Sequence, residues 1–306
     1  MTQTRPRILV IKLSALGDVV MALGPMQAIR RHHADAQITI LTTPLYAPFL
    51  REAGVADEIW TDGRPRGFFA TLALRRKLRA AKFSRVYDLQ TSGRSSSYFH
   101  LMRPRPPEWS GIAKGCSHPH KNPSRDFIHT LERQCGQLAD AGITGVAPPD
   151  LAFANADIAR FGLSPRFVLL VPGGSAHRPE KRWPVENFGA LASRLAQSGF
   201  QPVILGAGAE IDLARTIATF APDAVSLVDR TSFTDIATLG RAAHAAIGND
   251  TGPMHVLAAS GCRSIALFSS ASDPVLTAPR GRDVVILQRP RLADLGVDEV
   301  MAALGR

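Results

Sequence analysis

The chain has 306 residues, of which 45% are hydrophobic and 20% charged, a composition typical of a globular protein with a substantial core. This length suggests two domains rather than one. No apolar run in the sequence approaches the roughly 18 residues that a membrane-spanning helix needs, which argues against an integral membrane protein. The three cysteines are odd in number and far apart, so they predict neither a disulfide framework nor a cysteine-based metal site.

The positive charge is concentrated in the first half of the chain. Residues 1–155 carry 21 Lys and Arg against 12 Asp and Glu, whereas residues 156–306 carry 15 against 14. Between Arg64 and Arg125 there are 14 basic residues and only two acids. We therefore expect the first half to meet a polyanionic partner: a nucleic acid, an anionic membrane surface, or a phosphorylated or carboxylated substrate. The alternative is a basic surface that only aids solubility.

Strand and helix patterns alternate along the first half. Apolar segments at 8–11 and 38–41 flank a helical pattern at 19–32, which predicts a βαβ unit and hence a parallel sheet. Lys12 breaks the first apolar run, so we interpret this run as a strand of a cytoplasmic protein and not as a signal peptide. The further elements expected are a short helix at 46–52, a strand at 58–60, a basic amphipathic helix at 68–81, a strand at 85–89, a mostly irregular segment at 104–123 and a helix at 127–141.

The α/β pattern starts again after a Pro-rich linker at 147–150. Strands are expected at 167–171, 201–205, 225–228, 243–247, 264–268 and 283–287, and helices at 157–161, 185–198, 210–220, 234–241, from 253, and at 292–304. The chain is thus predicted to be an α/β protein with two doubly wound domains, residues 1–150 and 151–306, which bind ligands at the carboxyl ends of their strands. The terminal helix could pack back onto the first domain.

The motif GNDTGPMH at residues 248–255 follows a short apolar strand and leads into a helix. Pro253 suits the first turn of that helix, and Gly252 lets the backbone approach a ligand closely. The free N–H groups and the positive end of the helix dipole favour a phosphate at this turn. The same residues would also serve as an N-cap and a turn without any ligand.

Three other loops end strands of the second domain, at residues 172–175, 206–210 and 229–232. Because parallel strands end at one edge of their sheet, we expect these loops to converge with residues 249–252 into a cradle for a diphosphate. Lys181 could neutralise phosphate charge, and Glu210 could accept hydrogen bonds from ribose hydroxyls. Nucleotide binding is therefore assigned to the second half of the chain.

Five motifs are spread over nearly the whole chain: LSALGD at 13–18, DLQ at 88–90, HTLERQ at 129–134, KRWP at 181–184 and NDTGPMH at 249–255. In this order and spacing they resemble glycosyltransferase family 9, the bacterial heptosyltransferases. The resemblance implies a GT-B fold, with two Rossmann-like domains facing across a cleft. It also implies an inverting transfer of heptose from ADP-heptose to the inner core of lipopolysaccharide, on Kdo-lipid A or a core heptose, without a metal or other cofactor.

The resemblance further implies roles for individual residues. Asp18 would be the general base that takes the proton from the attacking acceptor hydroxyl, and Lys181 would steady the departing diphosphate. The alternatives are that Asp18 only caps a helix and that Lys181 only faces solvent. The residues expected to bind the donor are Ser14, Gly17, Gly174, Ser175, Glu210, Thr231, Asp250, Thr251, Gly252 and His255. For Glu210 the alternative is an acid favoured by the helix dipole, and for His255 a packing role.

Three histidines and a neighbouring arginine invite other interpretations. His129 and Arg133 lie one helical turn apart and are expected to be a structural pair. His118 and His120 lack the carboxylate or cysteine cluster that would complete a metal site, so no metal is expected.

The basic first half is where we expect the anionic acceptor to bind. The expected contacts lie on predicted loops and are mostly arginines, which suit bidentate binding of carboxylates and phosphates: Arg64, Arg66, Arg94, Arg103 and Lys121. The helix at 68–81 could also rest on the anionic face of the inner membrane; its alternative role is a core-packed helix with a solvated face. The protein is therefore expected to be cytoplasmic, peripheral to the inner membrane and monomeric.

Several other functions stay open at this point. A GT-B transferase could use another nucleotide sugar, a GT-B enzyme could hydrolyse or epimerise one, or the chain could be an idle nucleotide-sugar-binding homologue. From another class, the basic half could bind nucleic acid. No recognition motif for nucleic acid is visible and the basic residues are not interleaved with aromatics, so no nucleic-acid partner is expected.

Overall fold

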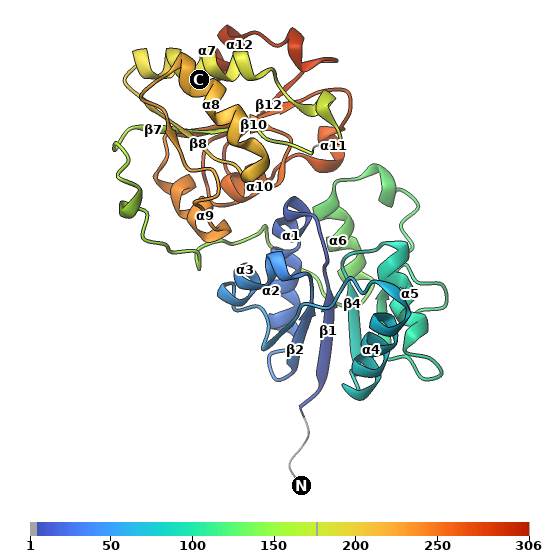
Figure 1. The fold of residues 1–306 in the computed structure, drawn as a ribbon. Coiled ribbons are helices and arrows are strands. Elements are labelled where there is room, and N and C mark those ends of the chain that lie inside the picture. Colours follow the sequence, from blue (N-terminus) through green and yellow to red (C-terminus); the bar gives the residue numbers. More distant parts are fainter. Residues whose placement is uncertain (1–4, 176, 306) are drawn as a thin grey trace. The chain divides into compact units, whose positions relative to one another are not determined.

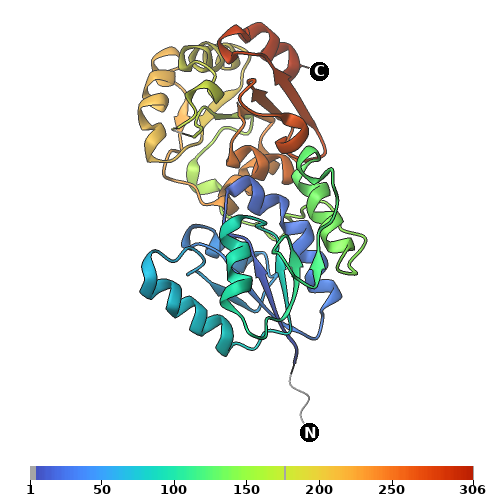
Figure 2. The ribbon, with the colours of Figure 1, turned by 90° about the vertical axis from the view of Figure 1, so that its right-hand side faces the viewer.

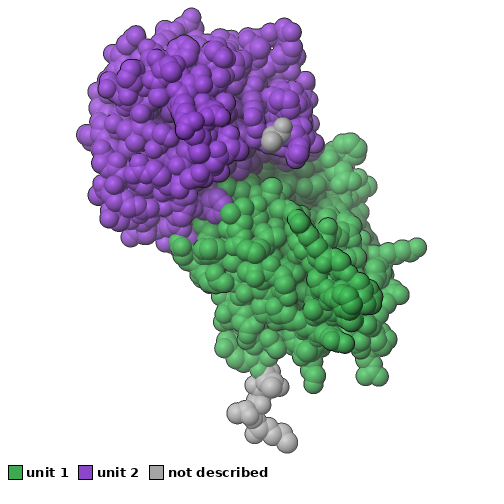
Figure 3. All heavy atoms as spheres, viewed as in Figure 1, with its two compact units in different colours: residues 1–150 green, residues 151–306 purple. Residues whose placement is uncertain are grey.

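The computed structural model describes residues 5–175 and 177–305. The chain divides into two compact units, unit 1 with residues 1–150 and unit 2 with residues 151–306 (Figure 3). None of the helices in the described residues is long and apolar enough to cross a membrane.

Unit 1 is built on a parallel sheet of six strands, as the βαβ pattern predicts (Figure 1). The apolar run at its start forms the central strand β1, where Val10 lies between Ile40 and Tyr87 of the two neighbouring strands. Strands buried on both faces are typically continuous apolar runs, which explains this local sequence. The strands are β1 (Arg7–Ile11), β2 (Gln37–Leu41), β3 (Glu58–Trp60), β4 (Arg85–Asp88), β5 (Glu108–Gly111) and β6 (His118–Pro119), in the order β3-β2-β1-β4-β5-β6.

Helices cover both faces of this sheet (Figures 1 and 2). Helices α4 and α5 pack together on one face, while α1 and α2 pack with α6 on the other. The helices of unit 1 are α1 (Leu16–Met21), α2 (Leu23–His32), α3 (Ala47–Glu52), α4 (Gly67–Ala80), α5 (Gly93–Leu101) and α6 (Thr130–Ala139), with short 3-10 turns at Pro44–Tyr46 and Arg125–Phe127.

Three details of unit 1 differ from the prediction. The helix expected at 19–32 begins earlier and is divided at Ala22, because Pro25 has no N–H to donate to the carbonyl of Met21. The segment expected to be irregular contains β5 and β6, since Trp109 and Ser110 pair with β4 despite their Pro-rich flanks. Helix α5 was not predicted, because its polar serines hide the helical pattern.

Unit 2 repeats the architecture of unit 1. Its strands are β7 (Phe167–Val171), β8 (Gln201–Ile204), β9 (Val225–Ser226), β10 (Ala245–Asn249), β11 (Ser264–Phe268) and β12 (Val284–Gln288), in the order β12-β11-β10-β7-β8-β9. Counted from the first strand of each unit, both sheets have the order 3-2-1-4-5-6. The order reverses between β1 and β4 in unit 1 and between β7 and β10 in unit 2. In doubly wound sheets such switch points are where ligands bind, at the carboxyl ends of the strands.

The helices of unit 2 also lie on both faces of its sheet (Figure 1). They are α7 (Val185–Gln197), α8 (Ile211–Phe220), α9 (Phe233–Ala242), α10 (Gly252–Ala259), α11 (Pro274–Thr277) and α12 (Val297–Leu304), with 3-10 turns at Ala159–Phe161, Pro179–Lys181, Gly208–Glu210 and Leu292–Asp294. The terminal helix α12 contributes Val300, Ala303 and Leu304 to the core of unit 2. The short helix α11 was not predicted.

The chain on the unit 1 side of the boundary is fixed to α2. The backbone carbonyl of Asp150 accepts a hydrogen bond from Gln27 Nε2 at 3.0 Å. Gly24 of α2 lets the chain pass closely, because a Cβ at this position would lie 2.1 Å from the carbonyl oxygen of Ala147. The residues expected to form a linker are therefore packed against unit 1 up to Asp150.

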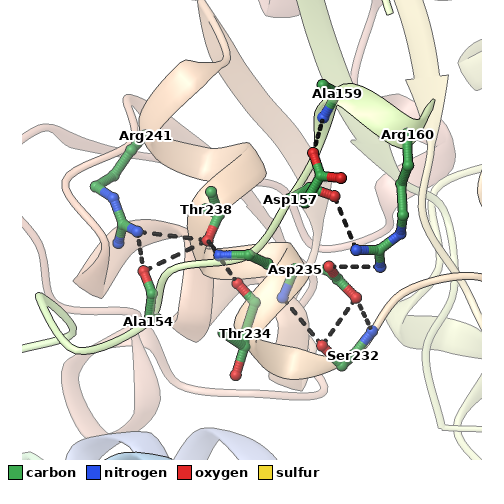
Figure 4. Close-up of polar contacts among 10 residues, drawn as sticks. Ala154, Asp157, Ala159, Arg160, Ser232, Thr234, Asp235, Thr238 and Arg241 are labelled. Atoms are coloured by element: carbon green, nitrogen blue, oxygen red, sulfur yellow. Dashed lines mark hydrogen bonds and ion pairs between the residues drawn. The ribbon is translucent and has the colours of Figure 1, made fainter. Parts of the chain in front are cut away.

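The chain on the unit 2 side of the boundary is fixed to α9 (Figure 4). The carbonyl of Ala154 accepts hydrogen bonds from Thr238 Oγ1 and from the guanidinium of Arg241, which also reaches the carbonyl of Leu151 at 3.3 Å. Further along, Arg160 forms an ion pair with the buried Asp235 at 2.7 Å. This segment is therefore part of unit 2 from its first residue.

Candidate active site

A cavity of about 250 Å³ lies at the carboxyl edge of the unit 2 sheet, at its switch point. Its walls come from the loops after β7, β8 and β10 and from the start of α9, so the four loops predicted to converge do so. One part of the wall is apolar, formed by Val171, Leu205, Phe233 and Ile236. The other part is polar and contains Gly174, Glu210, Thr231 and Thr251. An apolar slot beside polar groups suits a ligand with a flat ring and a polar tail.

Glycines in two of the turns make room for Glu210. A Cβ at Gly173 or at Gly206 would lie 2.8 Å from a side-chain carbon of Glu210, so neither position tolerates a larger residue without movement. Glu210 Oε2 accepts a hydrogen bond from the backbone N–H of Ala207 at 2.8 Å. Glu210 therefore caps its own turn and also forms part of the cavity wall.

The side chain of Asn249 holds the loops of unit 2 together. It is fully buried at the end of β10, and its Nδ2 donates hydrogen bonds to the carbonyls of Pro172 at 2.8 Å and Gly173 at 3.1 Å. Its Oδ1 accepts one from the N–H of Trp183 at 2.9 Å. Sequence reasoning did not assign this role; the available signal was an amide at the end of an otherwise apolar strand.

Lys181 and Asp250 form an ion pair beside this cavity. Lys181 Nζ lies 2.8 Å from Asp250 Oδ2, and both side chains are largely shielded from solvent. The sequence analysis gave the two residues separate tasks, whereas the structure shows that the carboxylate orients the ammonium. Next to them, Arg182 donates a hydrogen bond of 2.6 Å to the carbonyl of Gly174.

The remaining residues predicted to bind the donor in unit 2 lie at the start of α10, within it, and in the loop after β7. Thr251 occupies the N-cap position, and Gly252 begins the helix. His255 is buried within α10. Ser175 is exposed in the loop after β7. At the start of α10 the N–H of Gly252 lies next to Asp250, whereas Pro253 has no N–H and the N–H of Met254 is bonded to the carbonyl of Thr251 at 3.1 Å. The positive end of the helix dipole still favours a phosphate there.

A second pocket, of about 140 Å³, lies at the switch point of unit 1. Lys12 and Asp18 come from the segment after β1, and Gln90 and Thr91 from the loop after β4. Helix α6 closes the pocket with four polar side chains: Thr130, Arg133, Gln134 and Gln137.

Asp18 is the third residue of α1 and not its N-cap, yet its side chain caps the start of this helix. Its Oδ2 accepts a hydrogen bond from the N–H of Ala15 at 3.2 Å, and its carboxylate lines the pocket. Gly17, just before it, is buried, and Ser14 accepts a hydrogen bond from the guanidinium of Arg64. Ser14 and Gly17 thus lie beside Asp18 in unit 1. They were predicted to bind the donor, but they belong to a different sheet from the other predicted donor residues, which are all in unit 2.

Lys12 is a functional candidate that the sequence analysis missed. Its side chain is buried and donates a hydrogen bond of 3.2 Å to the carbonyl of Leu89. Burial lowers the pKa of Lys12, while the carboxylates of Asp18 and Asp88 favour its charged form. The signal was present, because a lysine that ends an apolar strand must be buried or paired.

Gln90 joins the two halves of the unit 1 switch point, and Asp88 holds the loop that carries Gln90. Gln90 Oε1 accepts hydrogen bonds from the N–H groups of Leu13 at 2.8 Å and Ser14 at 3.1 Å. Asp88 Oδ1 accepts hydrogen bonds from the N–H groups of Gln90 and Thr91. Burial raises the pKa of Asp88 to about 6.

The predicted acceptor residues fall at different places on unit 1. Arg64 and Arg66 follow β3, and Arg94 begins α5 after β4, so these three lie at the carboxyl edge that holds Asp18. Lys121 follows the edge strand β6 and is exposed. Arg103 lies between the end of α5 and the start of β5, at the opposite edge of the sheet. The structure therefore does not bring Arg103 to the pocket.

Two arginines that were not predicted as acceptor contacts take part in this pocket or its rim. Arg133, expected to be a structural partner of His129, lines the pocket and donates a hydrogen bond of 2.6 Å to Thr130 Oγ1. Arg125 donates to Thr91 Oγ1 at 3.2 Å. The pocket is therefore cationic, and the acid in its lining is the half-buried Asp18. Among the described residues, no group of three or more His, Cys, Asp or Glu side chains is placed to hold a metal ion.

Two doubly wound units, each with a polar site at its switch point, are the architecture of the GT-B fold. Residues 71–299 match the family model described as glycosyltransferase family 9 (heptosyltransferase). The chain belongs to this family, as its motifs predict, and is a transferase.

Individual relatives agree with the family. The chain is 27% identical to lipopolysaccharide heptosyltransferase 2 of Escherichia coli K12, over 89% of this chain and 85% of that protein. Its fold is similar to that of a glycosyl transferase family 9 protein from Veillonella parvula, with a TM-score of 0.82, 19% identity and coverage of 98% of this chain and 96% of the other. It is also similar to an E. coli heptosyltransferase solved with ADP, with a TM-score of 0.76, 21% identity and coverage of 98% and 99%. The predicted GT-B fold is confirmed.

Proposed function

We propose that this protein transfers a heptose from ADP-heptose to the inner core of lipopolysaccharide, with inversion at the anomeric carbon and without a metal. The observation that carries the proposal is the cavity of unit 2, which joins an apolar slot to a helix N-terminus beside the Lys181–Asp250 pair. The names of the relatives support the sugar and the acceptor, and the structure solved with ADP supports the nucleotide.

In this proposal each part of the donor has its own contacts in unit 2. The adenine ring occupies the apolar slot against Phe233 and Ile236, with the backbone at Thr231 near its edge, and Glu210 accepts hydrogen bonds from the ribose. The diphosphate lies against the start of α10, where Lys181 balances the charge that develops as the bond to the sugar breaks. Asp250 orients Lys181 and contacts the sugar.

Unit 1 supplies the acceptor side of the reaction. Asp18 takes the proton from the acceptor hydroxyl as its oxygen attacks the anomeric carbon from the face opposite the diphosphate, which inverts the configuration. Arg133 and the arginines of the same sheet edge, Arg64, Arg66 and Arg94, bind phosphate or carboxylate groups of the acceptor. Because this acceptor is linked to lipid, we place the protein, as a monomer, at the cytoplasmic face of the inner membrane.

Calorimetric titration with ADP, UDP, GDP and ADP-heptose tests the donor assignment. We expect the adenine nucleotides to bind about tenfold or more tightly than UDP and GDP, and Lys181→Ala to weaken ADP binding by about 10- to 100-fold, the range of a lost charge-assisted contact. Arg215→Ala, a change of an exposed cation on α8, is the matched control and should bind like the wild type. Preferred binding of UDP or GDP would leave the family and fold intact and would refute the ADP-heptose donor.

A further inference from the structure

The first turn of α4 exposes two adjacent aromatic side chains. Phe68 is 74% exposed and Phe69 84% exposed, and their rings contact each other edge to face at 5.7 Å. Leu45, 65% exposed, follows β2 at the same edge of the unit 1 sheet. Large apolar side chains that gather in this way on a surface typically mark an interaction site.

The rest of α4 is firmly held, so these rings are presented by an anchored helix. Leu74 and Leu78 are buried in the core of unit 1. Lys77 forms an ion pair with Asp62 at 3.1 Å and lies 4.3 Å from the centre of the Trp60 ring. The buried pair Leu74 and Leu78 fits the predicted role of α4 as a core-packed helix. The exposed pair Phe68 and Phe69 fits its predicted role as a helix that rests on a membrane.

The surroundings of the exposed pair are strongly cationic. From Gly63 to Arg105 the chain has 11 Lys and Arg, of which Lys77 pairs with Asp62 and Arg85 with Glu108, and the acid within this range, Asp88, is buried. Arg66 precedes the pair, and Arg76 and Arg79 follow it on the exposed side of α4. A groove of about 410 Å³ at the far end of α4 adds Lys82 and Arg105, next to apolar walls.

We propose that the exposed face of α4, with Phe68, Phe69, Arg66, Arg76 and Arg79, docks unit 1 onto an anionic lipid bilayer. Aromatic rings that enter the boundary of the acyl chains, together with arginines at the level of the headgroups, are the combination that holds a peripheral helix on such a surface. A neutral protein partner would gain nothing from the excess of uncompensated arginines, and a nucleic acid would gain little from two exposed Phe rings beside few other aromatics.

The position of the docking face relates membrane binding to the proposed reaction. The first turn of α4 follows β3 and therefore lies at the carboxyl edge of the sheet, the edge that holds Asp18 and the cationic pocket. A bilayer bound there would bring lipid-linked anionic acceptors to that edge. This use rests on the proposed function, whereas binding to the bilayer does not.

Cosedimentation of the full chain with lipid vesicles tests the proposal. We expect about tenfold or more tighter binding to vesicles of phosphatidylcholine mixed with phosphatidylglycerol than to phosphatidylcholine alone, and weaker binding as salt rises. The double variant Phe68→Ser/Phe69→Ser should lose on the order of tenfold or more in vesicle affinity. Arg76→Ser and Arg79→Ser should each lose about fivefold. Val275→Ser, which removes an exposed apolar side chain from unit 2, is the matched control and should bind as the wild type does.

A fluorescent reporter locates the contact. In Phe69→Trp, the emission of the new indole should shift to shorter wavelength on mixed vesicles and should be quenched by brominated lipids. Unchanged vesicle binding by the double Phe variant would overturn the proposal. The proposal would also be overturned if the wild-type chain formed dimers without lipid and the double variant did not. Titration of the same variants with ADP separates the two proposals: wild-type chain that binds mixed vesicles but not ADP would refute the donor assignment alone.

Discussion

The two units share one strand order, yet their switch points are held together by opposite chemistry. In unit 2 a neutral amide, Asn249, joins the two loops, and glycine turns and an apolar wall form the cavity. In unit 1 the corresponding loops are joined by Gln90 and by the buried Lys12, and the buried Asp88 holds the loop after β4. A cavity for a bulky ligand needs backbone that can approach closely, whereas a site for proton transfer needs charges held at fixed positions.

Asp18→Asn tests whether unit 1 performs the proton transfer, and it has the largest expected effect. If unit 1 performs the proton transfer, heptose transfer should fall by about 10²- to 10⁴-fold, because an amide cannot accept the proton. Binding of ADP should stay within about twofold of the wild type, since unit 2 holds the nucleotide; both are measured on the same preparation. A variant that kept more than about a tenth of wild-type turnover would remove Asp18 from the catalytic role.

Asn249→Ala tests the neutral link in unit 2. The change leaves the carbonyls of Pro172 and Gly173 and the N–H of Trp183 without this buried partner, so we expect a loss of about 3 kcal/mol in the free energy of unfolding. Chemical unfolding followed by the fluorescence of Trp183, with Trp60 and Trp109 replaced by Phe, reports on this unit. Asn187→Ala, at a half-buried position in the first turn of α7, is the matched control and should cost less than about 0.5 kcal/mol. Equal losses in both variants would mean that Asn249 is not the link between the loops.

Asp88→Asn tests the buried carboxylate of unit 1 through its pH dependence. The pKa of Asp88 is about 6 in the folded protein and near 3.8 when unfolded, so the folded state binds this proton more tightly. The contribution of Asp88 is therefore fully present below pH 4, is lost as pH rises to about 6, and stays lost above. The difference in unfolding free energy between wild type and Asp88→Asn should change by about 2–3 kcal/mol over this window, in favour of the variant at high pH.

The difference in unfolding free energy between the wild type and Asp88→Asn is the quantity to measure, because the titration of His33 changes stability in the opposite direction. Burial lowers the pKa of His33 to about 4, so its contribution to stability is lost as pH falls from about 6.5. His33 is present in both proteins, and its effect cancels. A flat difference curve would show that Asp88 titrates as an exposed carboxylate does.

The sequence predicted unit 2 better than unit 1 for a physical reason. The walls of the unit 2 cavity follow strands directly, and Gly-rich turns such as those around Gly173 and Gly206 mark them in the local sequence. The unit 1 pocket is assembled from Lys12, Gln90 and Arg133, which are far apart in the chain and meet only because β1, β4 and α6 pack together. No local pattern shows that packing, and for this reason Arg133 is interpreted as a structural residue from the sequence. Arg103 is predicted at the wrong edge because the polar sequence of α5, which carries the chain to the opposite edge, hides that helix.

The boundary between the units has a mechanical consequence. Asp150 is fastened to α2 and Leu151 to α9, so the flexible part of the connection is reduced to the backbone torsions around one peptide. A hinge of this length restricts the conformations that the tether can sample, and such a tether keeps the two sites at a high effective concentration with respect to each other. A donor and an acceptor bound to the two units of one chain would therefore meet far more often than a donor and an acceptor bound to two separate units at the same total concentration.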